Sequence, residues 1–141
     1  MNIDFIQDLW DKDSIIDNEL LHNESTKIPA LHAKYYKIYN NILTLKKAQE
    51  TQYKILKKEK WQYYTGKASP EVYVEKPFDF KVLKADLDKY FDADVDLIRC
   101  TAKIEYQQIM LEYLESILKV IQNRTYQIKN AIEWQRFTNG L

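Results

Sequence analysis

The sequence predicts an all-α fold, and three observations support this prediction. Two glycines and three prolines occur in 141 residues, whereas average usage is about 7% and about 5%. The long stretches without either residue are rich in Lys, Leu, Ile, Glu and Gln, which favour helix. Apolar residues recur in steps of three and four, the spacing of one helix face. A hydrophobic share of 45% also excludes a wholly disordered chain.

We expect a single domain of about four pieces. Residues 1–17 form an acidic segment with a short helix at about 2–12. Residues 18–66 form a long basic helix, kinked near Pro29 because a proline ring does not fit a regular helix interior. Gly66 follows the last turn, where a left-handed cap is expected.

The second half begins with a linker over residues 67–79. This linker holds Pro70 and Pro77, and we expect an extended chain around Val72-Tyr73-Val74. Residues 80–141 contain a short helix at about 80–91 and a second long helix at about 99–138.

The two long helices carry apolar seams typical of coiled coils. Helical residues 30–65 would extend roughly 54 Å at about 1.5 Å per residue, more than the roughly 37 Å diameter of a compact chain of this size. We therefore expect an elongated helical hairpin. The seams are Ile28, Leu31, Tyr35, Ile38, Ile42 and Leu45, and Ile104, Gln107, Leu111, Leu114, Leu118, Ile121, Thr125, Ile128 and Ile132.

A further apolar stripe lies beside the second seam, at Met110, Tyr113, Ile117 and Val120. A helix that is apolar over a wide arc is buried on several sides. We expect other copies of the chain to cover it through coiled-coil-like packing, and the alternative is that the N-terminal helix folds back over it. The expected oligomerisation residues are Leu111, Leu114, Ile117, Leu118, Ile121, Ile128 and Ile132.

Charge is strongly partitioned although the net charge is zero. Residues 1–26 carry seven acids and one lysine, a net of −6, and residues 27–67 carry ten lysines and two acids, a net of +8. Residues 68–141 carry ten basic and twelve acidic residues. One part of the surface can therefore attract a polyanion, while the acidic start either contacts a basic partner or is simply solvated.

No pattern of a catalytic, metal or cofactor site is found, so we expect no enzyme. His22 and His32 are ten residues apart, which matches no common metal-ligand spacing. Cys100 has no histidine nearby in sequence, and two distant glycines cannot form a phosphate loop. An enzyme would need a metal or an activated nucleophile that these residues do not suggest.

An acidic run near the middle of the chain raises the question of calcium binding. The run lacks the glycine and terminal glutamate of a helix–loop–helix calcium site. We interpret it as helix capping and solvated surface. Its members are Asp86, Asp88, Asp92, Asp94 and Asp96.

The segment 54–67 alternates cations with flat aromatic rings. On a helix, Tyr53, Lys57, Lys60 and Tyr64 share one face, and Lys54, Lys58 and Trp61 share the adjoining one. Lysines neutralise phosphates and aromatic rings stack on exposed bases, a combination that suits single-stranded nucleic acid. The predicted DNA-binding residues are Lys54, Lys57, Lys58, Lys60, Trp61, Tyr63, Tyr64 and Lys67.

Two other interpretations of this segment stay open. Lysines are common near helix C-termini because of the helix dipole, and Tyr63, seven residues after Leu56, could continue the core. The chain could then be a helical scaffold or interaction protein without DNA binding. Repetition of the segment in an oligomer would strengthen DNA binding, because weak sites on one strand add through effective concentration.

The same segment resembles the UvsY family, the recombination mediator proteins of T-even-like phages. The family pattern of two spaced basic residues, a Tyr-Tyr pair, Ser/Thr-Gly and a basic residue is matched by residues 58–67, which read KEKWQYYTGK. The similarity covers roughly residues 15–141. Further matches are Ile16-Asp17, Tyr106, Leu111-Glu112-Tyr113, Arg124, Ile128-Lys129, Arg136-Phe137 and Gly140.

The resemblance implies a non-enzymatic function in homologous recombination, replication and repair. Family members form ring-like homo-oligomers, hexamers or heptamers, largely through the C-terminal helix, and bind single-stranded DNA without sequence preference. Their partners are the phage recombinase, UvsX, which they load onto DNA, and the phage single-strand-binding protein that covers it. By position, Lys58 and Lys60 correspond to the family's DNA-contacting basic pair.

This chain departs from the family pattern at several positions. Lysine replaces arginine at 60 and 67, and Lys57 and Trp61 replace aliphatic residues. Lysine lacks the bidentate fork of arginine, so phosphate contacts would be less directional. The start of the chain lacks a secretion signal, and no apolar stretch is long enough to span a bilayer. We expect the cytoplasm of an infected host and no membrane partner.

Overall fold

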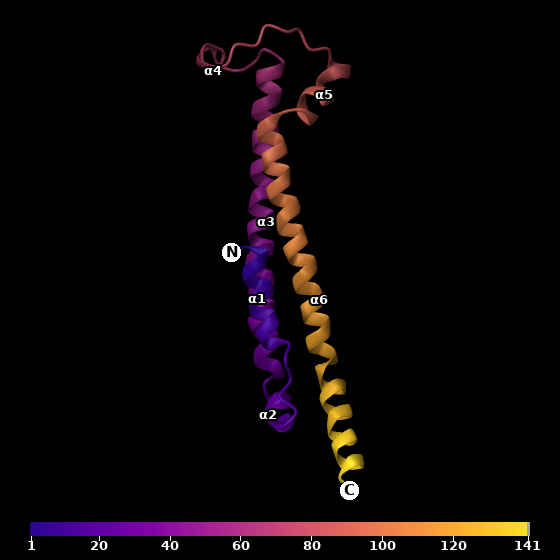
Figure 1. The fold of residues 1–141 in the computed structure, drawn as a ribbon. Helices are drawn as coiled ribbons and strands as arrows, with labels where there is room; N and C mark the ends of the chain where they lie inside the picture. The colour runs from indigo at the N-terminus through magenta and orange to yellow at the C-terminus, as the bar shows by residue number, and fades with distance from the viewer. Residues whose placement is uncertain (141) are drawn as a thin grey trace. The chain divides into compact units, whose positions relative to one another are not determined.

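The structure is a computed structural model, and it describes residues 1–140. Across these residues it is helical, with no strand, and the all-α prediction is confirmed. Figure 1 shows the order of the elements. They are α1 (Ile3–Asp13), α2 (Leu21–Thr26), α3 (Ile28–Tyr64), α4 (Pro70–Glu75), the 3-10 helix η1 (Lys84–Asp86), α5 (Leu87–Asp92) and α6 (Val95–Thr138).

The chain forms two compact units. We call residues 1–43 together with those from 109 onward the terminal unit, and residues 44–108 the central unit. The two long helices, α3 and α6, contribute residues to both units. The basic half of α3 and the sequence motif at its end belong entirely to the central unit.

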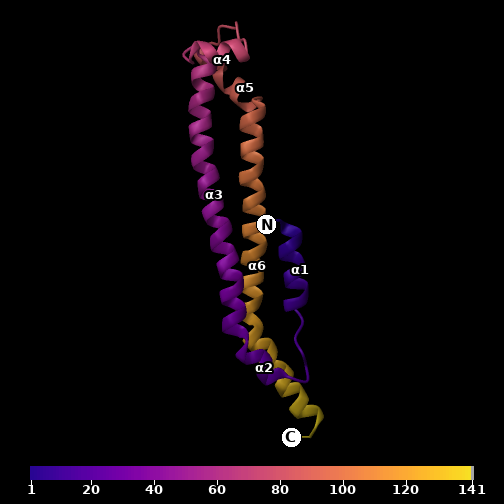
Figure 2. The same ribbon diagram turned by 90° about the vertical axis from the view of Figure 1, so that its left-hand side faces the viewer.

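The core of the terminal unit is formed by α1, α3 and α6. Figure 2 shows α1 lying along α6 in this unit. The ring of Trp10 meets that of Tyr35 edge to face, with 5.4 Å between centroids, and Tyr35 is completely buried. These contacts bury apolar faces of all three helices, the main favourable contribution to folding. The buried set is Ile6, Tyr35, Ile42, Met110, Leu111, Leu114, Ile117 and Ile121.

The N-terminal helix therefore covers the second apolar stripe of α6. Met110 is 4% exposed and Ile117 is 2% exposed within a single chain, and Tyr113 packs against the same core. Val120, at the end of the stripe, is 41% exposed. The alternative interpretation of this stripe is the correct one for its buried residues, because α1 supplies Ile6 and its apolar neighbours in place of a second copy.

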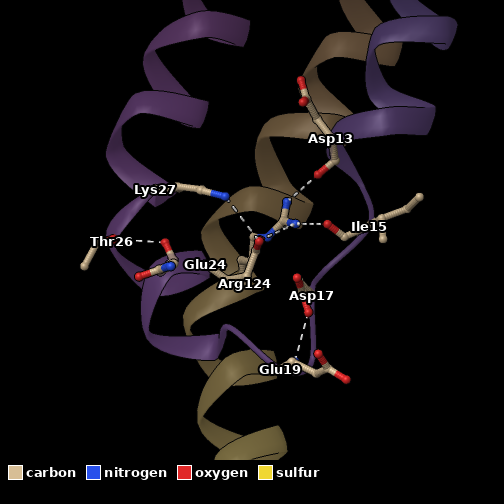
Figure 3. A network of polar contacts seen from close by, with 9 residues as sticks. Asp13, Ile15, Asp17, Glu19, Glu24, Thr26, Lys27 and Arg124 are labelled. Atoms are coloured by element: carbon tan, nitrogen blue, oxygen red, sulfur yellow. Dashed lines mark hydrogen bonds and ion pairs between the residues drawn. The ribbon is translucent and has the colours of Figure 1, made fainter.

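A buried arginine fixes the segment after α1 to α6. Arg124 is 3% exposed, and it donates hydrogen bonds to the carbonyls of Asp13 at 2.9 Å and Ile15 at 3.1 Å. Its guanidinium also lies 3.6 Å from the carboxylate of Glu24 in α2 (Figure 3). A guanidinium offers several donors in a fixed plane, so this one side chain satisfies three partners.

The region around Pro29 differs from the expected kink. The helix breaks at Lys27, and α3 starts at Ile28, so Pro29 is the second residue of a new helix. A proline in the first turn costs no hydrogen bond, because the first N–H groups of a helix have no partner within it. The prediction of one helix from 18 was wrong for this reason.

The predicted extended chain at 72–74 is also wrong. Pro70 starts α4, which Ser69 precedes with an extended backbone. The Tyr73 hydroxyl donates a hydrogen bond to the Tyr63 carbonyl at 2.8 Å, which satisfies part of the last turn of α3. Proline at the first helical position has the backbone angle that a helix needs, so Ser-Pro here is a helix start.

In the second half of the central unit, the short helix begins later in the sequence than expected, and the long helix begins earlier. Residues 80–83 are not helical, and η1 and α5 occupy 84–92. The long helix α6 begins at Val95 because Asp94 caps it, accepting a hydrogen bond from the Leu97 backbone N–H at 3.0 Å. Within this unit α3 and α6 are antiparallel, since Lys46 bonds to Gln108 and Lys60 to Asp96.

Substituting Arg124→Ala will lower the free energy of unfolding by about 3 kcal/mol, because it removes the donor to the Asp13 and Ile15 carbonyls and leaves the carboxylate of Glu24 with Lys27 as its remaining ion-pair partner. Urea unfolding followed by circular dichroism measures this change. Arg136→Ala removes an exposed arginine from the same helix and should stay within about 0.5 kcal/mol of the wild type. Equal stability of the two variants would contradict the anchoring role of Arg124.

Candidate nucleic-acid interface

A glycine cap ends α3 immediately after the basic segment. Gly66 has a φ of +76°, its N–H bonds to the Tyr63 carbonyl, and the Lys67 N–H bonds to the Gln62 carbonyl at 2.8 Å. This pair of bonds is the Schellman motif, which favours glycine at the left-handed position. The predicted cap is confirmed, and it turns Lys67 back towards the helix.

One face of the end of α3 is an exposed strip of cations around an indole ring. Lys54, Lys57, Lys58 and Lys67 are exposed, and Trp61 is 38% exposed. Lys57 and Lys58 lie three and four residues after Lys54, and Trp61 lies four and three residues after these two lysines, so the four side chains are neighbours on the helix surface. The Lys67 ammonium lies 4.4 Å from the centre of the Trp61 ring. We call these five residues the lysine strip.

The cations of the lysine strip are available to a ligand. Within residues 1–140, none of its four lysines forms an ion pair with a carboxylate. Lys57 instead lies 5.4 Å from the centre of the Phe91 ring and 5.9 Å from that of Tyr53. Four exposed lysines around a half-exposed ring can neutralise phosphates while a base stacks on the indole.

The other predicted DNA-binding residues, Lys60, Tyr63 and Tyr64, face the interior of the central unit. The Lys60 ammonium lies 2.7 Å from the carboxylate of Asp96 and 3.3 Å from that of Asp94, and its side chain is 16% exposed. The Tyr64 hydroxyl donates to Asp94 at 2.6 Å. Asp94 therefore accepts from Lys60, Tyr64 and its own helix N-terminus. We call Lys60, Tyr64, Asp94 and Asp96 the carboxylate clamp.

The opposite charges in the carboxylate clamp stabilise one another, and they shift the pKa values of Asp94, Asp96 and Lys60. Burial alone would raise the pKa of Asp94, but hydrogen bonds from Tyr64 and the Leu97 backbone, with the charge of Lys60, hold it below 3.8. A hydrogen bond from Lys60 lowers the pKa of Asp96. Burial alone would lower the pKa of Lys60, but its two carboxylate partners raise it. All three groups are charged at neutral pH.

The two tyrosines of the motif are part of an aromatic cluster. Tyr63 stacks on Tyr73 with 5.5 Å between centroids, and Tyr64 meets Phe78 at 5.3 Å and Tyr90 at 5.4 Å. The Tyr63 hydroxyl also donates to the Lys76 carbonyl at 3.0 Å. These rings hold the end of α3, the connecting segment and α5 together, which is the role that continuation of the core predicts for Tyr63.

Known proteins resemble this chain over nearly its whole length. The family model for the recombination, repair and single-stranded-DNA-binding protein UvsY matches residues 9–141. The chain belongs to the UvsY family. The Recombination protein uvsY of Enterobacteria phage T4 is 23% identical over 140 residues, covering 99% of each chain.

Solved structures of the T4 recombination mediator protein UvsY share the fold. One crystal form, lattice type II, superposes with a TM-score of 0.85 over 99% of this chain and 98% of that chain, at 23% identity. Another, lattice type IV, gives a TM-score of 0.86 over 97% and 99% of the two chains, also at 23% identity. The fold of this UvsY-family chain is thus shared with the T4 protein.

Asp94 is the main residue of this region that the sequence interpretation missed. Asp94 was assigned with its acidic neighbours to caps and solvated surface, and the capping part is confirmed by its bond to Leu97. It is only 5% exposed, so the solvated part is wrong for this residue. The available signal was an aspartate three residues before Leu97 at a helix start, whereas its pairing with Lys60 leaves no mark in local sequence.

Two other features, a metal-binding cluster and a membrane-spanning helix, are absent from the part of this UvsY-family chain that the structure describes. No group of three or more His, Cys, Asp or Glu side chains within residues 1–140 is arranged to hold a metal ion. Over the same residues, no helix combines the length and the apolar character that a bilayer span requires.

Asp94→Asn will lower the free energy of unfolding by about 2 kcal/mol at neutral pH, because it weakens buried charge-assisted hydrogen bonds. The Asp94 pKa is depressed on folding, so the carboxylate stabilises the fold above about pH 4 and loses this effect as pH falls through its folded pKa, below 3.8. The difference between variant and wild type should therefore shrink below that pH.

Unfolding in urea as a function of pH measures this convergence. Asp79→Asn, at an exposed carboxylate in the same unit, is the control and should show little difference at any pH. A variant deficit that persists undiminished at pH 2 would show that the charge of Asp94 does not stabilise the fold.

Proposed function

We propose that this chain is a non-enzymatic recombination mediator that binds single-stranded DNA without sequence specificity through the lysine strip. The observation that carries the proposal is the strip itself, four exposed lysines that pair with no carboxylate of residues 1–140, around the half-exposed ring of Trp61. The phosphate backbone supplies most of the affinity in such sites, and stacking on an aromatic ring tolerates every base.

We infer the partners from the family resemblance. The bound strand would be offered to the phage recombinase, UvsX, in place of the single-strand-binding protein that covers it, in the cytoplasm of the infected host. The lysine strip supports the DNA step of this proposal. The acidic start of the chain, with exposed Asp4, Asp8 and Asp11 on α1, is the surface suited to a basic patch on a protein partner.

We also propose that copies of the chain associate through exposed apolar side chains of α6, forming the ring-like oligomer that the family resemblance implies. Of the residues expected to do this, Leu111, Leu114, Ile117, Ile121 and Ile128 are at most 3% exposed. Leu118 packs against the core of its own chain. These six already have partners inside the chain.

The exposed residues of α6 remain available for association. Ile132 is 39% exposed, Trp134 is 65% exposed and Phe137 is 76% exposed, and the last two rings stack at 5.9 Å. Large exposed aromatic side chains are typical of interface cores. Association would place several lysine strips along one strand, and effective concentration would then raise the affinity.

Lys58→Ala will reduce the slope of log affinity against log salt by about 0.7, the value for one lost phosphate contact on a single strand. Fluorescence anisotropy of a labelled oligo-dT over a range of salt concentrations measures this slope. Lys103→Ala, at an exposed lysine on α6 outside the strip, is the matched control and should leave the slope unchanged. A wild-type chain that binds no oligo-dT at low salt would instead support the scaffold interpretation.

The double variant Trp134→Ser, Phe137→Ser will shift the mass in solution from a multiple of 17.0 kDa towards the mass of one chain, because it removes the exposed rings of α6. Light scattering after size-exclusion chromatography measures the mass. Phe80→Ser changes an equally exposed ring of the central unit and serves as the control. Loss of association in the control alone would place the contact elsewhere.

A further inference from the structure

Lys60 differs from every lysine of the lysine strip in its surroundings. Its side chain is 16% exposed, and its ammonium contacts two carboxylates, Asp96 at 2.7 Å and Asp94 at 3.3 Å. Asp94 is itself buried and holds two further donors, the Tyr64 hydroxyl and the Leu97 N–H. To reach a phosphate, Lys60 would have to leave both carboxylates and leave the Asp94 charge buried without its cation, which is costly.

We propose that Lys60 is a positioning residue in DNA binding: it holds the end of α3 to the start of α6 through Asp94 and Asp96, and the lysine strip alone contacts phosphate. This inference rests on the proposed function and assigns its two basic motif residues, Lys58 and Lys60, to different tasks. Asp94 becomes a residue on which DNA binding depends, although its charge repels DNA.

The geometry explains how the clamp acts on the strip. Lys60 and Trp61 are neighbours in α3, and Tyr64 one turn later bonds to the same Asp94 oxygen that faces Lys60. The final turn that the clamp holds also carries the Gly66 cap, which places Lys67 over the Trp61 ring. Without the clamp this turn would fray, and Lys67 and Trp61 would lose their fixed relation to Lys54 and Lys58.

The salt dependence of binding separates positioning from contact. Lys60→Ala should weaken oligo-dT binding by about tenfold, the equivalent of one charge-assisted hydrogen bond, and leave the slope of log affinity against log salt unchanged. A slope reduced by about 0.7 would show a lost phosphate contact and overturn the proposal. Lys60→Arg, whose guanidinium can bridge the same two carboxylates, should restore most of the affinity.

Asparagine substitutions at Asp94 and Asp96 have opposite effects on DNA binding, depending on whether Lys60 positions the lysine strip or contacts DNA itself. If Lys60 positions the strip, Asp94→Asn and Asp96→Asn weaken binding. If Lys60 contacts DNA, both substitutions release it and remove a repelling charge, so binding tightens and the slope steepens, which would overturn the proposal. Asp96 is 39% exposed and outside the buried cap, so Asp96→Asn keeps the test decisive if Asp94→Asn fails to fold.

The two proposals fail in different ways. A wild-type chain with no salt-dependent binding of oligo-dT overturns the proposed function and this inference with it. A wild-type chain that binds, with Lys58→Ala and Lys60→Ala lowering the slope by the same amount, overturns the inference alone. Lys60→Ala with an unchanged slope, weaker binding and rescue by Lys60→Arg supports both.

Discussion

The central unit depends on the buried carboxylate of Asp94. It caps the long C-terminal helix by accepting a hydrogen bond from the Leu97 N–H. It also accepts a hydrogen bond from the Tyr64 hydroxyl of the basic helix and pairs with the Lys60 ammonium. A buried carboxylate is tolerated only when its lone pairs are satisfied and its charge is balanced, and here both conditions are met by α3 and α6 together. The capping of one helix and the pairing of two helices are therefore a single event, and the orientation of the lysine strip follows from it.

The helical class, the two long helices and the glycine cap could be predicted because each depends on local sequence. Scarce breakers, three-and-four spacing and Thr-Gly at the end of a basic run are local signals. The errors at Pro29 and Pro70 have a common cause: proline was interpreted as a disruption, whereas at both positions it lies in the first turn of a helix. Sequence spacing alone does not distinguish a helix start from a kink.

The candidate site was predictable in composition but only partly in orientation. Helical spacing placed the motif residues on two adjoining faces. In the structure the face of Lys54, Lys58 and Trp61 is exposed, whereas the other face is divided: Lys57 is exposed, and Lys60 and Tyr64 pack against α5 and α6. Which face turns inward depends on residues some thirty positions away, such as Asp94 and Phe91. The same holds for the apolar stripe of α6, whose cover, α1, lies about a hundred residues earlier in the chain.

The acidic beginning of the chain also has a structural role. Trp10 and Ile6 of α1 are packed against the core, and the carbonyls of Asp13 and Ile15 bind Arg124. Truncation is the common test of an acidic tail. Here, deleting the first fifteen residues would remove α1 from the hydrophobic core and expose Met110 and Ile117 to water. The truncated protein would aggregate through the newly exposed apolar surface, so its behaviour would not report on the role of the acidic residues. Neutralising Asp4, Asp8 and Asp11 in the intact chain removes the negative charge and keeps α1 in place, so it separates the role of the charge from the structural role of the helix.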